Sequence, residues 1–193
     1  MQTITQILAA ELGCAEKYVQ NVVALLDEGN TIPFIARYRK EAHGGMDDTA
    51  LRTLETRLQY LRSLEARRAE VRELIAAQEK LTDALSAQID AAATLAELED
   101  IYRPFRPKRR TRATIAKEKG LEPLADAIFA QTRDMLPPEK LALDYIDPEK
   151  GVESVEDALA GAGDILAERI SDDAALRKRL RELTAQQAVL RSK

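Results

Sequence analysis

The sequence predicts an all-α protein, an irregular multi-helix array with one long central helix and an N-terminal helix-turn-helix-like pair. Three observations support this prediction. Apolar residues recur at three- and four-residue spacing along most of the 193-residue chain. Residues that favour helices (Ala, Leu, Glu and Arg) are abundant, whereas aromatic residues make up 4% of the chain and tryptophan is absent. No alternating apolar and polar stretch is long enough to predict a strand.

Two short helices are expected at the N-terminus. The first covers residues 3–12 and stops at Gly13, and the second covers residues 15–28. Two short helices around a glycine turn resemble a helix-turn-helix, and the alternative is an αα-hairpin whose apolar stripes pack together. Pro33 then fits the first turn of a further short helix. We assign residues 1–45 to a helix-turn-helix-like subdomain.

Residues 46–193 are assigned to a scaffold organised around the long helix. Asp47 or Asp48 is expected to cap this helix by accepting hydrogen bonds from its free backbone amides. The apolar stripe follows a period of 3.6 residues and consists of Leu51, Leu54, Leu58, Leu61, Leu64, Val71 and Ile75. A run of about thirty residues without glycine or proline predicts a length of roughly 45 Å. Later segments are expected to fold back and cover the stripe.

Shorter helices are expected over the rest of the chain. They cover residues 82–92, 95–102 and 113–119, two segments on either side of Pro137-Pro138, and residues 154–190 with a cap at Ser171. Gly161 and Gly163 interrupt the last pattern, and each costs up to about 1 kcal/mol relative to alanine in a helix. We expect these glycines to allow a close helix contact or a bend.

The segment 103–112 is expected to be an extended basic loop, because Pro104 and Pro107 interrupt helical hydrogen bonding. The net charge of the chain is −4, but its charges are unevenly distributed. Residues 103–119 carry eight Lys or Arg against one Glu, and residues 120–173 carry fourteen Asp or Glu against four Lys or Arg. These two stretches could attract each other, or the basic one could bind a polyanion.

The basic loop is the one constellation that suggests a ligand, and that ligand is a nucleic acid, RNA or DNA. Cations in an extended segment can follow a phosphate backbone, and Tyr102 and Phe105 could stack on unpaired bases. In the alternative, both aromatic residues anchor the loop to the core and its arginines pair with the acidic stretch. Cations of the short helix near residue 38 could extend the basic surface. The candidate nucleic-acid-binding residues are Arg37, Arg39, Lys40, Arg103, Arg106, Lys108, Arg109, Arg110 and Arg112.

The sequence offers little for catalysis or metal binding. The single histidine, His43, lies in a glycine-flanked turn where we expect it to be solvated, and the single cysteine, Cys14, is expected to act as a small apolar residue. One His and one Cys cannot form a zinc site of the usual kind. We therefore expect no enzymatic activity, no cofactor and no metal.

The cytoplasm is the expected compartment. The single cysteine fits a reducing environment. The N-terminus lacks the pattern of a signal peptide, and no apolar run approaches the roughly 20 residues that span a bilayer. No association with a membrane is expected.

Two longer motifs are more specific than a helical pattern. One runs from Leu25 to Glu41 with the sequence LLDEGNTIPFIARYRKE and continues through Gly44-Gly45 to Leu51. The other covers residues 98–125 and includes LEDIY, PKRRTR and GLEPLA. With their spacing, these motifs resemble the N-terminal region of the Tex family of bacterial transcription accessory proteins.

The resemblance implies an accessory role in transcription for the intact protein. Tex-family proteins are longer and continue into an RNase-H-like domain, helix-hairpin-helix elements and an RNA-binding OB-fold, so we expect this chain to be a fragment. The family's nucleic-acid binding is attributed chiefly to that C-terminal part. Two functions follow as hypotheses. The chain is a nucleic-acid-associated helical module, or it is a non-binding scaffold that docks the remaining domains of the same protein or a partner from the transcription machinery.

Overall fold

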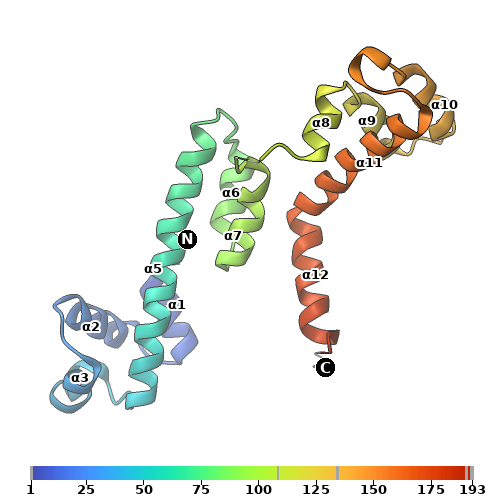
Figure 1. Ribbon diagram of the computed structural model, residues 1–193. Helices are drawn as coiled ribbons and strands as arrows, with labels where there is room; N and C mark the ends of the chain where they lie inside the picture. Colours follow the sequence, from blue (N-terminus) through green and yellow to red (C-terminus); the bar gives the residue numbers. More distant parts are fainter. Residues whose placement is uncertain (1, 108, 134, 190, 192–193) are drawn as a thin grey trace. The chain divides into compact units, whose positions relative to one another are not determined.

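The computed structural model describes residues 2–107, 109–133, 135–189 and 191, and this part of the chain is helical without a β-strand (Figure 1). The all-α prediction is therefore confirmed. Contacts divide the chain into two compact units, residues 1–90 and 91–193. This division differs from the sequence-based boundary at residue 45, because the first half of the long helix shares its core with the N-terminal helices.

The first unit contains six helices in its described residues. They are α1 (Ile4–Leu12), α2 (Glu16–Asp27), α3 (Ile32–Tyr38), α4 (Lys40–His43), the long α5 (Asp48–Ala76) and α6 (Asp83–Ala91), whose last residue lies in the second unit. The helices predicted over residues 3–12, 15–28 and 82–92 are each found with ends within one residue. The short helix after Thr31 is also found, with Pro33 in its first turn.

Local signals explain where the helices of the first unit begin and end. Thr3 and Gln6 form a capping box at the start of α1, and Gly13 ends that helix with a φ of 62°. Asp47 caps α5 as predicted, because its carboxylate accepts a hydrogen bond from the backbone amide of Ala50 at 2.7 Å.

The apolar stripe predicted for α5 is confirmed, since all seven of its members are buried. The helices α1, α2 and α3 gather along the first half of α5 (Figure 1). The core that they share consists of Leu8, Ala9, Val19, Val22, Ile32, Ile35, Leu51, Leu54, Leu58 and Leu61. Helices α1 and α2 bury their apolar stripes in this core, where they pack against each other and against α5.

His43 is buried, so the expectation of a solvated turn residue was wrong. Its side chain is 4% exposed, and neither ring nitrogen has a hydrogen-bond partner among the described residues. The short helix α4, which the sequence did not predict, packs against α2 and carries His43 at its end. Gly44 follows with a φ of 59°, and a Cβ at this position would overlap the ring of Tyr18.

The second unit is built from shorter helices. They are α7 (Leu95–Tyr102), the 3-10 turn η1 (Arg103–Phe105), α8 (Arg112–Glu118), α9 (Glu122–Ala130), α10 (Pro138–Ala142), the 3-10 turns η2 (Leu143–Tyr145) and η3 (Pro148–Lys150), α11 (Val155–Asp172) and α12 (Ala174–Gln187). Helices α8, α9, α10 and α11 surround a core that includes Leu121, Leu124, Ala162 and Ile165.

Two positions in α11 refine the sequence predictions. Gly161 allows a close contact, because a Cβ at this position would clash with the side chain of Leu121, whereas Gly163 has open space around it.

The break between α11 and α12 falls at Asp173, whose carboxylate accepts a hydrogen bond from the amide of Leu176 at 2.7 Å. The cap predicted at Ser171 was therefore wrong by two residues, because α11 continues through it.

Within the described ranges, no helix is both long enough and apolar enough to cross a membrane.

Candidate nucleic-acid interface

The basic segment 103–112 is irregular only in its middle. Arg103 to Phe105 form the 3-10 turn η1, since a proline is compatible with the first turn of a helix. Arg112 begins α8, and the Thr111 hydroxyl caps that helix by accepting a hydrogen bond from the amide of Thr114 at 3.1 Å. The described residues between these two elements, 106–107 and 109–111, are outside any helix as predicted, whereas the prediction of a loop was wrong at both ends.

Most arginines of this segment are paired with carboxylates of the second unit. Arg103 pairs with Asp172 at 2.9 Å, and Arg106 pairs with Glu99. Pairs of more exposed side chains are formed by Arg110 with Glu118 at 2.6 Å and by Arg112 with Asp164 at 3.7 Å. Two of these four carboxylates, Asp172 and Asp164, belong to the acidic stretch that the sequence offered as the alternative partner of the loop.

The remaining members of the segment differ in accessibility. Arg109 is exposed and has no ion pair within the described ranges. Lys108, the other predicted member, lies outside the described residues. Tyr102 is 6% exposed and Phe105 is half-buried. The aromatic side chains of this segment therefore anchor it to the second unit, and Tyr102 is not available to stack on a base.

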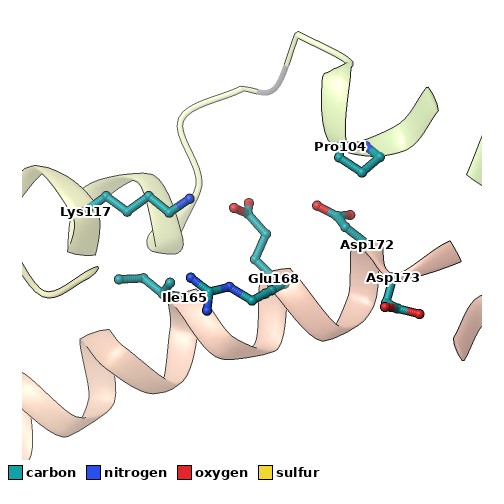
Figure 2. Close-up of a pocket in the computed structure, with 7 residues that line it drawn as sticks. Pro104, Lys117, Ile165, Glu168, Asp172 and Asp173 are labelled. Atoms are coloured by element: carbon teal, nitrogen blue, oxygen red, sulfur yellow. The ribbon is translucent and has the colours of Figure 1, made fainter. Parts of the chain in front are cut away.

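A cavity of about 330 Å³ lies between η1, α8 and α11. Its charged lining mixes two cations, Lys117 and Arg169, with three carboxylates, Glu168, Asp172 and Asp173. Figure 2 shows Glu168 and Asp172 projecting from α11 toward the side of Pro104 and Lys117. The carboxylates repel a phosphate backbone, so this cavity does not favour a nucleic acid.

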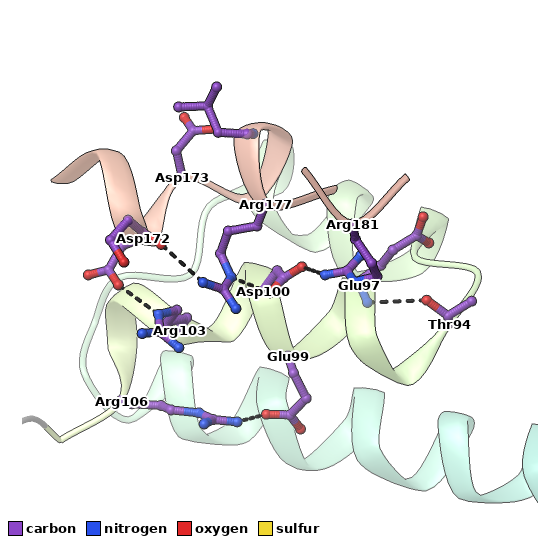
Figure 3. A network of polar contacts seen from close by, with 12 residues as sticks. Thr94, Glu97, Glu99, Asp100, Arg103, Arg106, Asp172, Asp173, Arg177 and Arg181 are labelled. Atoms are coloured by element: carbon purple, nitrogen blue, oxygen red, sulfur yellow. Dashed lines mark hydrogen bonds and ion pairs between the residues drawn. The ribbon is translucent and has the colours of Figure 1, made fainter. Parts of the chain in front are cut away.

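The last helix, α12, is held on α7 by charged groups (Figure 3). The carboxylate of Asp100, with a side chain 7% exposed, accepts hydrogen bonds from Arg177 at 2.6 Å and from Arg181. Lys178 pairs with Glu97 at 2.7 Å. The hydrogen bond from Lys178, with a further one from a backbone amide, lowers the pKa of Glu97 below its usual value. These cations of α12 are neutralised by α7 and do not add to a phosphate-binding surface.

A second candidate surface lies in the first unit, on α3 and α4. The predicted residues Arg37, Arg39 and Lys40 are all exposed, and no carboxylate in the described part of the chain forms an ion pair with them. Two large aromatic side chains accompany them, Phe34 at 37% and Tyr38 at 61% exposure. We call these five residues the α3–α4 surface.

Sequence reasoning identified the three cations of this surface but missed its two aromatic residues. The available signal was the spacing of Phe34 and Tyr38, which are four positions apart and therefore share one face of the helix. Ile32 and Ile35 point into the core from the other side of α3.

Comparisons with known proteins find one family model within each of the two units. A family model described as the Tex-like protein N-terminal domain matches residues 2–76, and one described as Tex central region-like matches residues 133–193. Protein tex of Bordetella pertussis is 53% identical over 91% of this chain, and protein YhgF of Escherichia coli is 50% identical over 92%. Transcriptional accessory protein Tex of Neisseria gonorrhoeae is 47% identical over 93%.

The chain belongs to the Tex family and corresponds to the N-terminal part of its members. It spans 22% of the length of the Bordetella relative and 23% of the length of the other two. The family predicted from the two motifs is thereby confirmed.

Proposed function

We propose that this chain is a nucleic-acid-binding module of a transcription accessory protein, with the α3–α4 surface as its main phosphate-binding site. The observation that carries the proposal is the exposure of Arg37, Arg39 and Lys40 without carboxylate partners in the described part of the chain. Binding to a polyanion uses cations that no carboxylate already neutralises. Each such cation that contacts a phosphate releases counterions that were condensed on the nucleic acid. The role in transcription rests on family membership and on the name of the Neisseria relative.

The basic segment 103–112 contributes less to this function than its sequence suggests. Four of its arginines already have carboxylate partners, and a phosphate would have to compete with them. Arg109 is the member that we expect to add a phosphate contact. We therefore propose the predicted cations of the first unit, and not the predicted loop, as the main phosphate contacts.

The exposed face of α2 is a poorer candidate for a nucleic-acid contact. It carries one exposed cation, Lys17, and one exposed carboxylate, Asp27, which is paired with Arg62 at 2.7 Å. The exposed amides of Gln20 and Asn21 already donate to Glu16 and to the carbonyl oxygen of Ala42. A helix that enters a groove of nucleic acid normally presents several cations or amides. We therefore do not assign the helix-turn-helix-like pair a recognition role in the proposed function.

We propose a binding role without catalysis, located in the cytoplasm. The single histidine is enclosed in the first unit, and the single cysteine is half-buried against the same core. Among the described residues, no cluster of His, Cys, Asp or Glu has the arrangement of a metal site. The burial of His43 and the half-buried position of Cys14 support the non-catalytic role, and the cytoplasmic location rests on the single cysteine of the sequence.

The test is a salt titration of binding to fluorescein-labelled single- and double-stranded RNA and DNA, read by anisotropy. The variant carries Arg37→Gln, Arg39→Gln and Lys40→Gln. A control with the same charge change carries Lys80→Gln, Lys140→Gln and Arg179→Gln, three exposed cations without an ion pair in the described ranges.

We expect affinity to fall with rising salt, and we expect the variant to flatten the logarithmic salt slope by about 2, at roughly 0.7 for each lost phosphate contact on a single strand. The control should keep the slope of the parent chain. Equal loss in the variant and the control would show that total charge, not this surface, governs binding. Absence of binding at low salt would overturn the proposal.

A second candidate function, a docking scaffold, is favoured by α12. Its charged side faces α7, and its apolar residues Leu176, Leu180 and Leu183 are 43%, 62% and 41% exposed. We infer that this apolar face binds the part of a Tex-family protein that lies beyond the length that this chain spans. The test is calorimetric titration with the part of the Bordetella relative that lies beyond the 22% spanned by this chain. Binding that Leu180→Ser leaves unchanged, or no binding at all, would refute the scaffold.

A further inference from the structure

We propose that Tyr38, braced by Phe34, is a stacking platform for an unpaired base, so that the α3–α4 surface takes single-stranded nucleic acid. This inference rests on the proposed function, because it names the class of nucleic acid that the same surface binds. It adds a contact with a base to the phosphate contacts of the three cations.

The first observation is the exposure of a large ring on an otherwise well-packed helix. Ile32 and Ile35 are 3% and 0% exposed, so α3 is firmly seated in the core of the first unit. On the opposite side Tyr38 keeps 61% of its surface in water. Phe34, at 37% exposure, lies beside it, so the two rings form a contiguous exposed aromatic surface that a ligand with a flat apolar face could cover.

The second observation is that the ring of Tyr38 packs against the ring of Phe34. The rings of Phe34 and Tyr38 lie 5.3 Å apart between centroids with an interplanar angle of 46°. The guanidinium of Arg39 lies 6.0 Å from the centroid of Phe34. Phe34 is therefore flanked by two groups, and Tyr38 is the more exposed ring. A ring braced in this way loses less side-chain entropy when a base stacks on it.

The third observation is the chemistry around the ring. Arg37 and Lys40 are exposed on the same short stretch of chain and have no ion pair in the described part of the chain. Cations beside an exposed aromatic side chain are the combination that binds single strands, since the cations contact phosphates and the ring stacks on a base. In a duplex the faces of the bases are already stacked, and exposing one requires a few kcal/mol.

Other aromatic residues lack this combination. Tyr102 is buried in the second unit and is already contacted by Arg106. Phe129 is 53% exposed with Arg169 over its ring at 5.4 Å, but that arginine is paired with Asp126 at 2.7 Å. Phe129 therefore provides a matched control: an exposed ring with a cation above it that is already neutralised.

The experiment measures binding of the full 193-residue chain to three labelled 12-residue probes at one low salt concentration. The probes are oligothymidylate, an abasic strand of the same length and charge, and a duplex of the same length. Oligouridylate is measured alongside to separate RNA from DNA. The variants are Tyr38→Leu, Tyr38→Phe and the control Phe129→Leu, each checked for helicity by circular dichroism.

We expect oligothymidylate to bind about tenfold more tightly than the abasic strand, which is the effect of stacking one base. Tyr38→Leu should remove this tenfold difference without changing affinity for the abasic strand. Tyr38→Phe should stay within about twofold of the parent chain, because it keeps a ring. Phe129→Leu should have no effect.

Three results would overturn the inference. If the base-containing and abasic strands bind equally, or if Tyr38→Leu matches the parent chain, Tyr38 stacks on no base. If the duplex binds as tightly as oligothymidylate, the surface is not selective for single strands. In each case the proposed function stands as long as binding still depends on Arg37, Arg39 and Lys40. Loss of all binding by the parent chain would refute both.

Discussion

Replacing Asp100 with asparagine should release α12 from α7. Helix α12 has no buried residue, so charged contacts are its main attachment to the second unit. The carboxylate of Asp100 is the centre of these contacts, since Arg177 and Arg181 both donate to it. Asparagine has nearly the same size, so the substitution removes charge and one acceptor without creating a cavity.

The magnitude follows from the two hydrogen bonds. A hydrogen bond to a charged group contributes about 1.5–3 kcal/mol, and the lower end applies because the side chains of Arg177 and Arg181 are 34% and 41% exposed. The amide of asparagine keeps one acceptor, which forms a bond about half as strong, and turns a donor toward the other arginine. The loss is about 2 kcal/mol, which corresponds to about a 30-fold rise in the population of undocked α12.

Amide hydrogen exchange of residues 174–187 is the assay. Protection of α12 should fall about 30-fold in the variant, while protection of α8 and α11 in the core of the same unit stays unchanged. Arg179→Gln is the control, because Arg179 lies on α12, is exposed and has no ion pair in the described part of the chain. Unchanged protection of α12, or an equal loss in the control, would refute the reasoning that charge holds this helix.

Two further predictions concern the second unit. Gly161→Ala should lower the free energy of unfolding by about 1–3 kcal/mol, because the added Cβ overlaps Leu121. Gly163→Ala should raise the free energy of unfolding by up to about 1 kcal/mol. Urea denaturation measures both changes, and changes of the same sign in the two variants would contradict this contrast. Glu97→Gln should destabilise the unit at pH 7, because the Lys178 hydrogen bond lowers the pKa of Glu97. Stability from a lowered carboxylate pKa is present above the unfolded value and lost as pH falls through the folded one. The difference between variant and parent in thermal midpoint should therefore shrink as the pH falls below the ordinary pKa of a glutamate, and a difference that stays constant in acid would contradict the assignment.

Local signals predicted much of the fold. The seven-residue stripe of α5, the cap at Asp47 and the stop at Gly13 depend on residues within a few positions of one another, and each was confirmed. The errors fell where a distant segment decides the outcome. His43 is buried because α4 packs on α2, and no pattern near residue 43 reports that contact.

The candidate site was predicted less completely. The sequence predicted Arg37, Arg39 and Lys40 as binding residues. Only the folded unit shows that they form no ion pair with a carboxylate in the described part of the chain. The segment 103–112 seemed the stronger candidate because a charge run is easy to see in a sequence. Its carboxylate partners include Asp164 and Asp172, more than fifty positions away, so no local reading could show that its arginines were paired.

The sequence by itself determined the helical class, the long helix and the family, because these depend on backbone propensity, a period of 3.6 residues and contiguous motifs. Only the tertiary structure decided which charges are neutralised and which aromatic rings are exposed. Electrostatic pairing and burial depend on distances through space, and these are set by how helices far apart in the chain come together. For this protein, that difference moved the proposed binding site from the most basic segment to Tyr38 and the three cations beside it.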